Sequence, residues 1–196
     1  MKKTSKALLL VLCAVLLVVG SVFGTMAYLT STAEVKNTFT FGKVAITMDE
    51  TDVDLYGVKD GDTRVTANTY KLIPGHEYVK DPVIHVDKDS ENCFLFVELS
   101  NAIADIEDAT TIANQLIANN WVLLVDGEAD VYYYNEICGA NYNIPTFASF
   151  KIKGTETDLS AYKDSTVEVT AYAVQADGFA NANAAWLATF GAPATP

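Results

Sequence analysis

The sequence predicts an all-β protein, folded as a two-sheet antiparallel sandwich with one helix in a connection. Three observations predict this class. Half of the 196 residues (50%) are hydrophobic, which is enough for the core of one domain. The apolar residues fall into about seven short segments that alternate or run continuously, as strands do. Only one segment repeats its apolar residues at helical spacing over several turns.

A first strand is expected over residues 38–48. Its apolar side chains change parity at Gly42, where a bulge would insert one residue and keep them all facing one core. These side chains are Phe39, Phe41, Val44, Ile46 and Met48. The acidic stretch that follows, residues 49–62, is rich in turn residues and is expected to be a surface loop.

Two further strands are expected after the turn signal at residues 72–75. The first covers Val79–Val86. Pro82 inside it lacks the N–H that a sheet ladder needs, so this strand should lie at an edge or begin there. The second covers Cys93–Leu99 and is almost continuously apolar, as expected of a strand covered on both faces.

One helix is expected after that strand. Ser100 or Asn101 offers an N-cap, and acidic residues stand near the helix start. Apolar residues recur at helical spacing at Ile103, Ile106, Ala109, Ala113, Leu116 and Ile117. The pattern predicts a helix over residues 103–117.

The rest of the chain is predicted to be mainly β-structure. Residues 121–125 and 131–134 flank Asp126-Gly127 as a hairpin. Residues 147–152 and 167–174 alternate as half-buried strands do. The β-sandwich domain is therefore expected over residues 38–180, followed by a C-terminal tail, 181–196, with a short helix that packs Trp186.

The charge of the chain excludes several classes of function. It carries 13 Lys plus Arg against 25 Asp plus Glu, a net charge of -12. Nucleic acids and anionic lipid headgroups require a basic face, so neither is expected as a partner. Repulsion between copies is relieved by salt, divalent cations or acid, so any self-association should depend on ions and pH.

Residues 1–27 have the layout of a secretory signal peptide. Three lysines within the first six residues precede an apolar run, and small or polar residues then lead to Ala27. We expect cleavage between Ala27 and Tyr28, with membrane contact only during export. An uncleaved anchor is the alternative, because the uncharged run could just span a bilayer. Cys13 lies inside the apolar run rather than at its end, which argues against a lipoprotein.

Cleavage would change both the charge and the N-terminus. Removing residues 1–27 takes away three lysines and no acids, which leaves 10 basic against 25 acidic side chains, a net charge of -15. The new N-terminal segment, residues 28–37, lacks a strong core pattern and is rich in Thr, Ser and Ala. It is expected to be a mobile arm.

Two cysteines remain after cleavage, Cys93 and Cys138. An even pair in an exported chain suggests one disulfide, whose closed loop of about 45 residues would contribute about 4 kcal/mol by chain entropy. The alternative is two buried small apolar residues that never meet. There is no Cys-x-x-Cys, so neither a redox motif nor a zinc knuckle is indicated.

The sequence offers little catalytic or metal-binding chemistry. His76-Glu77 begins like a zincin motif, but Lys80 stands where the second histidine belongs. Asp52 and Asp54 imitate the start of a calcium loop, but Thr63 stands where the bidentate Glu should be, so they form only a weak calcium candidate. We therefore expect no catalytic residue, no metal and no cofactor.

Several motifs together resemble the TasA/camelysin family of exported proteins of Gram-positive bacteria. They are the signal-peptide end Gly24–Thr30, the stretch Asn37–Thr47, the turn Leu72–Gly75, the hairpin strand Val131–Asn135 and the segment Val169–Phe179. The resemblance covers most of the chain in order and is loose around residues 49–70 and 100–120.

The resemblance implies a jelly-roll-like sandwich, cleavage by a SipW-type signal peptidase, and assembly into extracellular biofilm-matrix fibres. In TasA-like fibres the freed N-terminal segment of one subunit is thought to complete a sheet of the next. Here that donor would be residues 28–37, up to the start of the first strand, with Tyr28, Leu29 and Val35 as anchors. Camelysin relatives have been classed as metalloproteases, for which the residues here offer no recognisable metal site.

We therefore expect a secreted, non-enzymatic structural protein that polymerises at the cell surface or in the matrix. One alternative is a monomeric secreted or surface module that binds a partner. A camelysin-like surface metalloprotease is the third.

Overall fold

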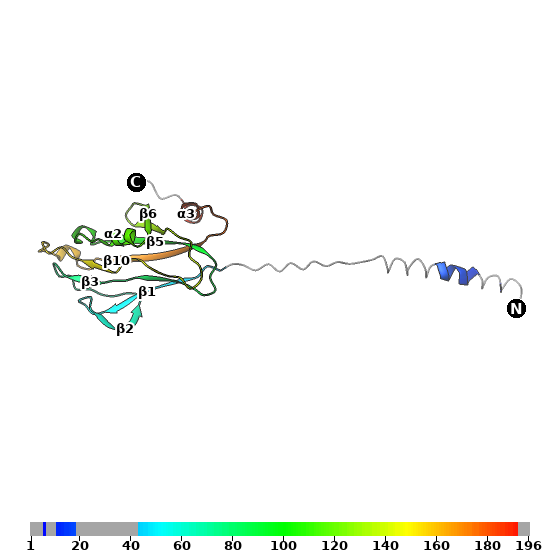
Figure 1. Cartoon of the computed structure of the whole chain (residues 1–196), viewed down its shortest axis with the longest axis horizontal. Coiled ribbons are helices and arrows are strands. Elements are labelled where there is room, and N and C mark those ends of the chain that lie inside the picture. The colour runs from blue at the N-terminus through cyan, green and yellow to red at the C-terminus, as the bar shows by residue number, and fades with distance from the viewer. Residues whose placement is uncertain (1–5, 7–10, 19–42, 192–196) are drawn as a thin grey trace. The chain divides into compact units, whose positions relative to one another are not determined.

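The computed structural model describes Lys6, residues 11–18 and residues 43–191 of the chain (Figure 1). Residues 11–18 are helical. The chain divides after Thr40, and Phe41–Pro196 forms one compact unit, called the body below. In the part that the structure describes, no helix combines the length and apolar character needed to cross a bilayer. The expected cleavage site at Ala27 and Tyr28 and the arm of residues 28–37 lie outside the described residues.

The body is β-rich, and its sheets are antiparallel. The first sheet has the order β2-β1-β4-β8, formed by β1 (Ile46–Val53), β2 (Lys59–Val65), β4 (Val83–Val86) and β8 (Asn143–Pro145). The second has the order β10-β5-β7-β6, formed by β5 (Cys93–Asn101), β6 (Trp121–Val125), β7 (Asp130–Tyr134) and β10 (Val167–Gln175). A third pair joins β3 (Glu77–Val79) to β9 (Ser149–Lys151).

The main hydrophobic core draws side chains from all three sheets. β5 is its centre: every residue from Cys93 to Val97 is buried, which confirms the expectation of a strand covered on both faces. β3 and β9 add Tyr78 and Phe150, whose rings stack with centroids 4.8 Å apart. Burial of this kind is the dominant stabilising contribution to a domain of this size.

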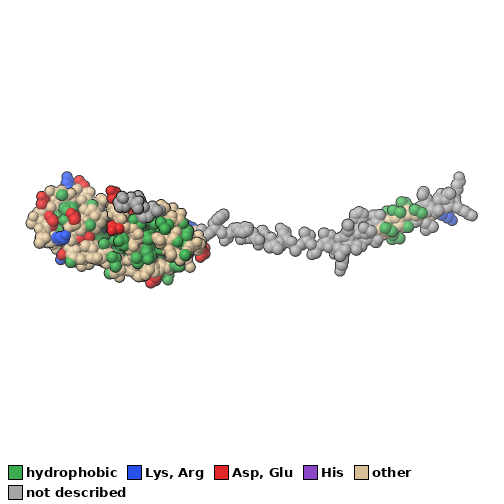
Figure 2. Space-filling model, turned by 90° about the horizontal axis from the view of Figure 1, so that it is seen from above, with side chains coloured by type: hydrophobic (Ala, Val, Ile, Leu, Met, Phe, Trp, Pro, Cys, Tyr) green, Lys and Arg blue, Asp and Glu red, His purple; other side chains and the backbone are tan. Residues whose placement is uncertain are grey.

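A smaller core lies on the other face of the second sheet. Helix α3 (Ala182–Phe190), capped by the Asn181 side chain, packs Trp186 against Phe96 of β5, with ring centroids 5.1 Å apart. The short helix expected in the tail is therefore present and packs Trp186. On the side that carries α3 and β6, hydrophobic side chains also gather at the surface (Figure 2). Leu187 and Phe190 of α3 are exposed.

The expectation of a surface loop over residues 49–62 is wrong. β1 continues to Val53 and β2 begins at Lys59, so most of this stretch is a β-hairpin. Its turn depends on Gly57, which has φ +71°, and a Cβ there would lie 2.8 Å from the Tyr78 Cα. β2 is almost wholly exposed, so it carries no apolar alternation that would mark it as a strand.

The strand expected over Val79–Val86 is two strands. β3 ends at Val79, and β4 begins at Val83, directly after Pro82. The alternative that a strand begins at Pro82 is therefore confirmed. The hydrogen-bonded ladder of β4 starts one residue after Pro82, so the N–H that proline lacks is not needed in it. β8 was not expected, because Asn143–Pro145 is too short to show a period.

The single helix expected over residues 103–117 is also wrong. The segment forms a 3-10 turn, η1 (Ala104–Ile106), and a separate helix α2 (Ile112–Ala118) that is capped by Thr111. Between them Glu107 pairs as an isolated bridge with Ile152. Both pieces bury apolar residues toward the same core, so their combined spacing imitates one longer helix.

Candidate functional site

Strand β10 forms one border of the candidate site. All nine of its residues pair with β5, from Val167 opposite Asn101 to Gln175 opposite Cys93. On its other side β10 has no strand partner within the described residues. A nine-residue edge of this kind presents a row of unpaired backbone groups, which natural proteins usually shorten, charge or cover.

The direction of the backbone groups of β10 follows from its two ends. Ala176 N donates to Asn92 O at 2.8 Å, and Ala102 N donates to Thr166 O at 3.1 Å, so residues 166 and 176 both turn toward β5. Because the direction alternates along an antiparallel strand, the odd-numbered residues turn their N–H and C=O groups outward. These residues are Val167, Val169, Ala171, Ala173 and Gln175.

Within the described residues, the first half of β1 forms a second open border. Residues 46–49 pair with β4 on one side, whereas β2 pairs only from Glu50 onward. Asp87 N donates to Ala45 O at 2.9 Å, so the odd-numbered residues here turn toward β4. By the same alternation Ile46 and Met48 turn their backbone groups to the open side.

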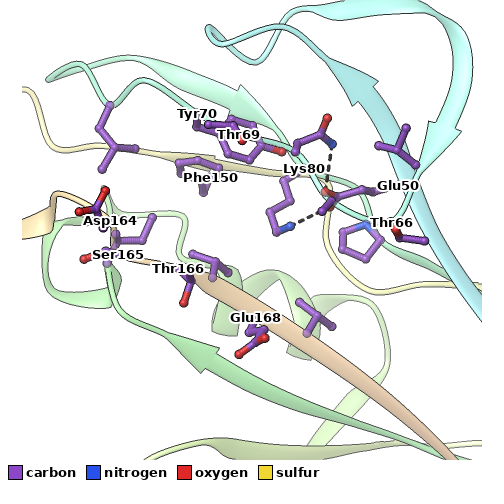
Figure 3. A pocket seen from close by; sticks show the side chains of 18 of the residues that line it. Glu50, Thr66, Thr69, Tyr70, Lys80, Phe150, Asp164, Ser165, Thr166 and Glu168 are labelled. Carbon is purple, nitrogen blue, oxygen red and sulfur yellow. Dashed lines mark hydrogen bonds and ion pairs between the residues drawn. The ribbon is translucent and has the colours of Figure 1, made fainter.

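A groove of about 740 Å³ runs between these borders (Figure 3). Its walls are the middle of β1, the start of β10, the connection after β2, and the segment around η2 (Ser160–Tyr162). We call the groove and its two strand borders the open seam.

The apolar side chains that line the seam are only partly covered. β1 and β10 turn alternate side chains inward onto the main core, as strands with one buried face do. The inward-facing residues of these two strands remain partly exposed: Ile46, Met48, Val167, Val169, Ala171 and Ala173. The core therefore lacks cover along the seam, while the interior of β5 next to it is fully buried.

A nearly buried ion pair stands in one wall of the seam. Lys80 Nζ donates to Glu50 Oε2 at 2.7 Å, and the Asn68 amide donates to Glu50 Oε1 at 3.0 Å (Figure 3). The Glu50 and Lys80 side chains are only 5% and 11% exposed. Asn68 also bonds the β1 backbone, accepting from Val53 N and donating to Thr51 O. The connection after β2 is thereby hydrogen-bonded to β1 and forms one wall of the seam.

Acidic groups outnumber basic ones along the seam. Asp49, Glu50, Asp164 and Glu168 line it, against Lys80 and Lys163. Asp49 also belongs to a polar cluster, since it accepts from Arg64 and lies 3.1 Å from His85 Nε2. Burial alone would raise the pKa of the Asp49 carboxyl, but the hydrogen bonds from Arg64 and His85 hold it below its usual value.

The two cysteines expected to remain after cleavage lie opposite each other. Cys93 and Cys138 form an isolated antiparallel bridge and are both free thiols, fully buried in the main core. The alternative that they never meet is therefore wrong.

The weak calcium candidate uses its carboxylates in hydrogen bonds. Asp54 Oδ1 accepts from Tyr56 N at 2.8 Å and from Val58 N at 2.9 Å, which closes the β1–β2 turn. Asp52 accepts from the Thr63 hydroxyl across the hairpin. Within residues 43–191 and the described helical residues, no group of three or more His, Cys, Asp or Glu is placed to hold a metal ion.

The residues that resembled a zincin motif have structural partners. His76 Nε2 lies 2.8 Å from Tyr56 O, and Glu77 accepts from the Ser149 hydroxyl at 2.8 Å. Lys80 is engaged with Glu50, as described above.

Sequence reasoning missed the residues that form the seam wall. Glu50 was assigned to a loop, although it shares the parity of Ile46 and Met48 and so could have been placed on the inner face. Nothing in the sequence pairs it with Lys80 or Asn68, which lie 30 and 18 positions away.

Comparison with known proteins gives no match: no family model, no curated protein and no solved structure matches this chain. The resemblance to the TasA/camelysin family remains a prediction from the motifs alone.

Proposed function

We propose that this chain is a secreted structural protein that assembles into extracellular fibres by strand addition. A SipW-type signal peptidase cuts between Ala27 and Tyr28, and the freed segment 28–37 of one copy enters the open seam of the next. The body is a jelly-roll-like sandwich that receives its missing strand from a neighbour. The protein performs this role without catalysis or a cofactor.

One observation carries the proposal: within the described residues the edge of β10 has no strand partner, its first three residues line a groove, and its inward side chains leave the core partly covered. A guest strand there would satisfy the outward backbone groups of β10 and bury the inward side chains of both borders. Backbone pairing supplies affinity in strand addition, and alternate side chains supply specificity.

The segment 28–37 fits the edge of β10 in length and pattern. It has ten residues, against nine in β10. Leu29, Ala33 and Val35 share one parity, so they face the core together, while Glu34 and Lys36 share the other and face solvent. Tyr28 shares the solvent-facing parity of Glu34 and Lys36, so it can anchor the segment only where the groove ends.

Cleavage would act as the trigger of assembly. While residues 1–27 are attached, the donor is tethered to the exporting membrane, and after cleavage it is free to reach another copy. The net charge of -15 for the cleaved chain opposes close approach, so assembly should be faster at higher ionic strength.

The experiment compares protein that starts at Tyr28 with protein that starts at Thr38. Size-exclusion chromatography and electron microscopy should show polymers of the first and monomers of the second. A synthetic peptide of residues 28–37 should then bind the shorter protein with one-to-one stoichiometry.

Two other results would lead to different conclusions. If both proteins are monomers and the peptide does not bind, the donor proposal is wrong, and a monomeric binding module becomes the better description. If the longer protein is monomeric and does not bind the peptide that the shorter one binds, the arm occupies its own seam.

A further inference from the structure

The two buried cysteines lie where the chain crosses between the two main sheets. Cys93 begins β5, directly after the connection from β4 of the first sheet. Cys138 lies in the connection that returns from β7 to β8 of the first sheet. The backbones exchange two hydrogen bonds, Cys93 N to Cys138 O at 2.8 Å and Cys138 N to Cys93 O at 2.9 Å. The two crossings are thus adjacent and joined at these residues.

The register of this pair suits a disulfide. In a hydrogen-bonded antiparallel pair the Cα atoms lie about 5.5 Å apart, within the range found across disulfides. The Cβ atoms of such a pair lie up to about 5.5 Å apart, whereas a disulfide brings them to about 4 Å. Closing the bridge therefore requires the two Cβ atoms to approach by up to about 1.5 Å.

The packed body resists that approach and also protects the sulfur atoms. Both residues have 0% exposure and belong to the main core cluster. Burial raises the pKa of the Cys93 thiol to about 11 and that of Cys138 to about 12. Since the thiolate is the species that attacks a disulfide, folded thiols at neutral pH have neither the ionisation nor the access that exchange needs.

We infer that Cys93 and Cys138 form an oxidative-folding site, whose disulfide is made while the chain folds in the presence of a small-molecule disulfide and is fixed once the body closes. One thiolate attacks the oxidant, forms a mixed disulfide and releases one thiol. The second cysteine then displaces the other half as a second thiol. The protein loses two hydrogens, the oxidant gains them, and one S–S bond replaces another.

The disulfide would form whether or not the protein assembles into fibres. It makes the pair a covalent link between the two sheet crossings, set once by the conditions of folding. It also differs from a reversible redox switch, which requires an accessible, ionised thiol.

The experiment uses protein that starts at Tyr28, which contains the whole body and lacks Cys13. One sample is refolded from denaturant with oxidised and reduced glutathione. The other is folded under reducing conditions, freed of reductant, and then exposed to the same glutathione mixture for the same time. Intact mass and thiol titration, each with and without denaturant, report the state of the two cysteines.

The refolded sample should lose two hydrogens and show no titratable thiol even in denaturant. The folded, reduced sample should keep both thiols, which become titratable only on unfolding. The bridged protein should also have a urea midpoint higher by about 1 to 2 M, because the closed loop holds about 45 residues.

Either of two results would overturn the inference: refolding with glutathione that leaves two free thiols, or a folded sample that oxidises as fast as the unfolded chain. The double variant Cys93→Ala, Cys138→Ala controls for mass changes from glutathione adducts elsewhere. Its own folding is not required, because the decisive comparison uses the unchanged protein.

Discussion

Glu50 and Lys80 form an ion pair across the wall of the open seam, with Nζ and Oε2 2.7 Å apart and both side chains nearly buried. Glu50 faces inward from β1, in line with Ile46 and Met48, so a charged side chain occupies a position that would otherwise be apolar. Its cost of burial is offset by the Lys80 ammonium and by the Asn68 amide.

Removing only the lysine should therefore destabilise the body. Lys80→Met leaves the Glu50 carboxylate without its countercharge, and we expect a loss of roughly 3 kcal/mol in the free energy of unfolding. The double variant Glu50→Gln, Lys80→Met should recover most of that loss, because no unpaired charge remains. Urea unfolding of the three proteins measures both effects, and a Lys80→Met protein within about 0.5 kcal/mol of the unchanged one would contradict the assignment.

The open edge of β10 can be blocked without disturbing its pairing with β5. Ala171 turns its N–H outward, so Ala171→Pro removes a donor from the edge and leaves the β5 ladder in place. We expect this variant to fold, to bind the 28–37 peptide at least about tenfold more weakly, and to polymerise poorly.

Ala171→Ser is the matched control, since it keeps the N–H and nearly the same volume. It should assemble as the unchanged protein does. Circular dichroism of both variants checks the fold, and equal polymerisation of the proline variant would show that strand addition does not use this edge.

His85 should make the stability of the body depend on pH. Its ring lies 2.6 Å from Asn143 Oδ1 and 3.1 Å from Asp49 Oδ1, and Arg64 Nε donates to the same Asp49 oxygen. The pKa of His85 is raised, chiefly by the hydrogen bond with Asn143 and then by Asp49. Because the folded pKa exceeds the unfolded one, protonated His85 stabilises the fold fully below about pH 6.5, and this is lost as pH rises through the folded value.

His85→Gln should therefore be less stable than the unchanged protein at pH 5.5, and the difference should shrink by pH 8.5. The side chain is 32% exposed, so the effect should stay below about 1 kcal/mol. Lys163→Gln, which removes one exposed positive charge, is the control for net charge. Melting temperatures across this pH range provide the measurement, and a gap that widens with pH would contradict the assignment.

Glu107 should make the stability of the body depend on pH in the direction opposite to that of an ion-paired carboxylate. It is 3% exposed, and burial raises its pKa although Ile112 N and the Asn101 amide donate to it. The folded body therefore holds a proton on Glu107 more readily than the unfolded chain does. Its ionisation weakens the fold above about pH 4.5, and stability returns as pH falls toward that value.

Glu107→Gln should consequently stabilise the body at pH 7, by up to about 1 kcal/mol, and change little near pH 4. Glu91→Gln, at an exposed position, should have no such effect. Urea midpoints at both pH values test this, and a Glu107→Gln protein that is weaker at pH 7 would show that the carboxylate is needed in its charged form.

The sequence predicted those elements whose buried apolar side chains recur at a regular spacing. β5, the hairpin of β6 and β7, and β10 were all expected within a residue or two, because their side chains face a core on one or both sides. β2 was not predicted because both of its faces are exposed to solvent. Only its backbone pairing with β1 identifies it as a strand.

The open seam could not be predicted from the sequence. It depends on the order of strands in two sheets, which places β10 at one border and leaves the first half of β1 paired on one side only within the described residues. Likewise the meeting of Cys93 and Cys138 follows from two sheet crossings that are 45 positions apart. Local patterns carry no information about such contacts.

The alternation along β10 has a consequence for the spacing of any polymer built on it. The residues that offer backbone groups to the outside are also those whose side chains point inward, so a guest displaced by one position would lose its bonds and turn its polar side chains inward together. Displacements are then allowed only in pairs of residues, about 7 Å at a time. The repeat distance of such a filament would therefore change only in discrete steps, set by the register in which the arm is inserted.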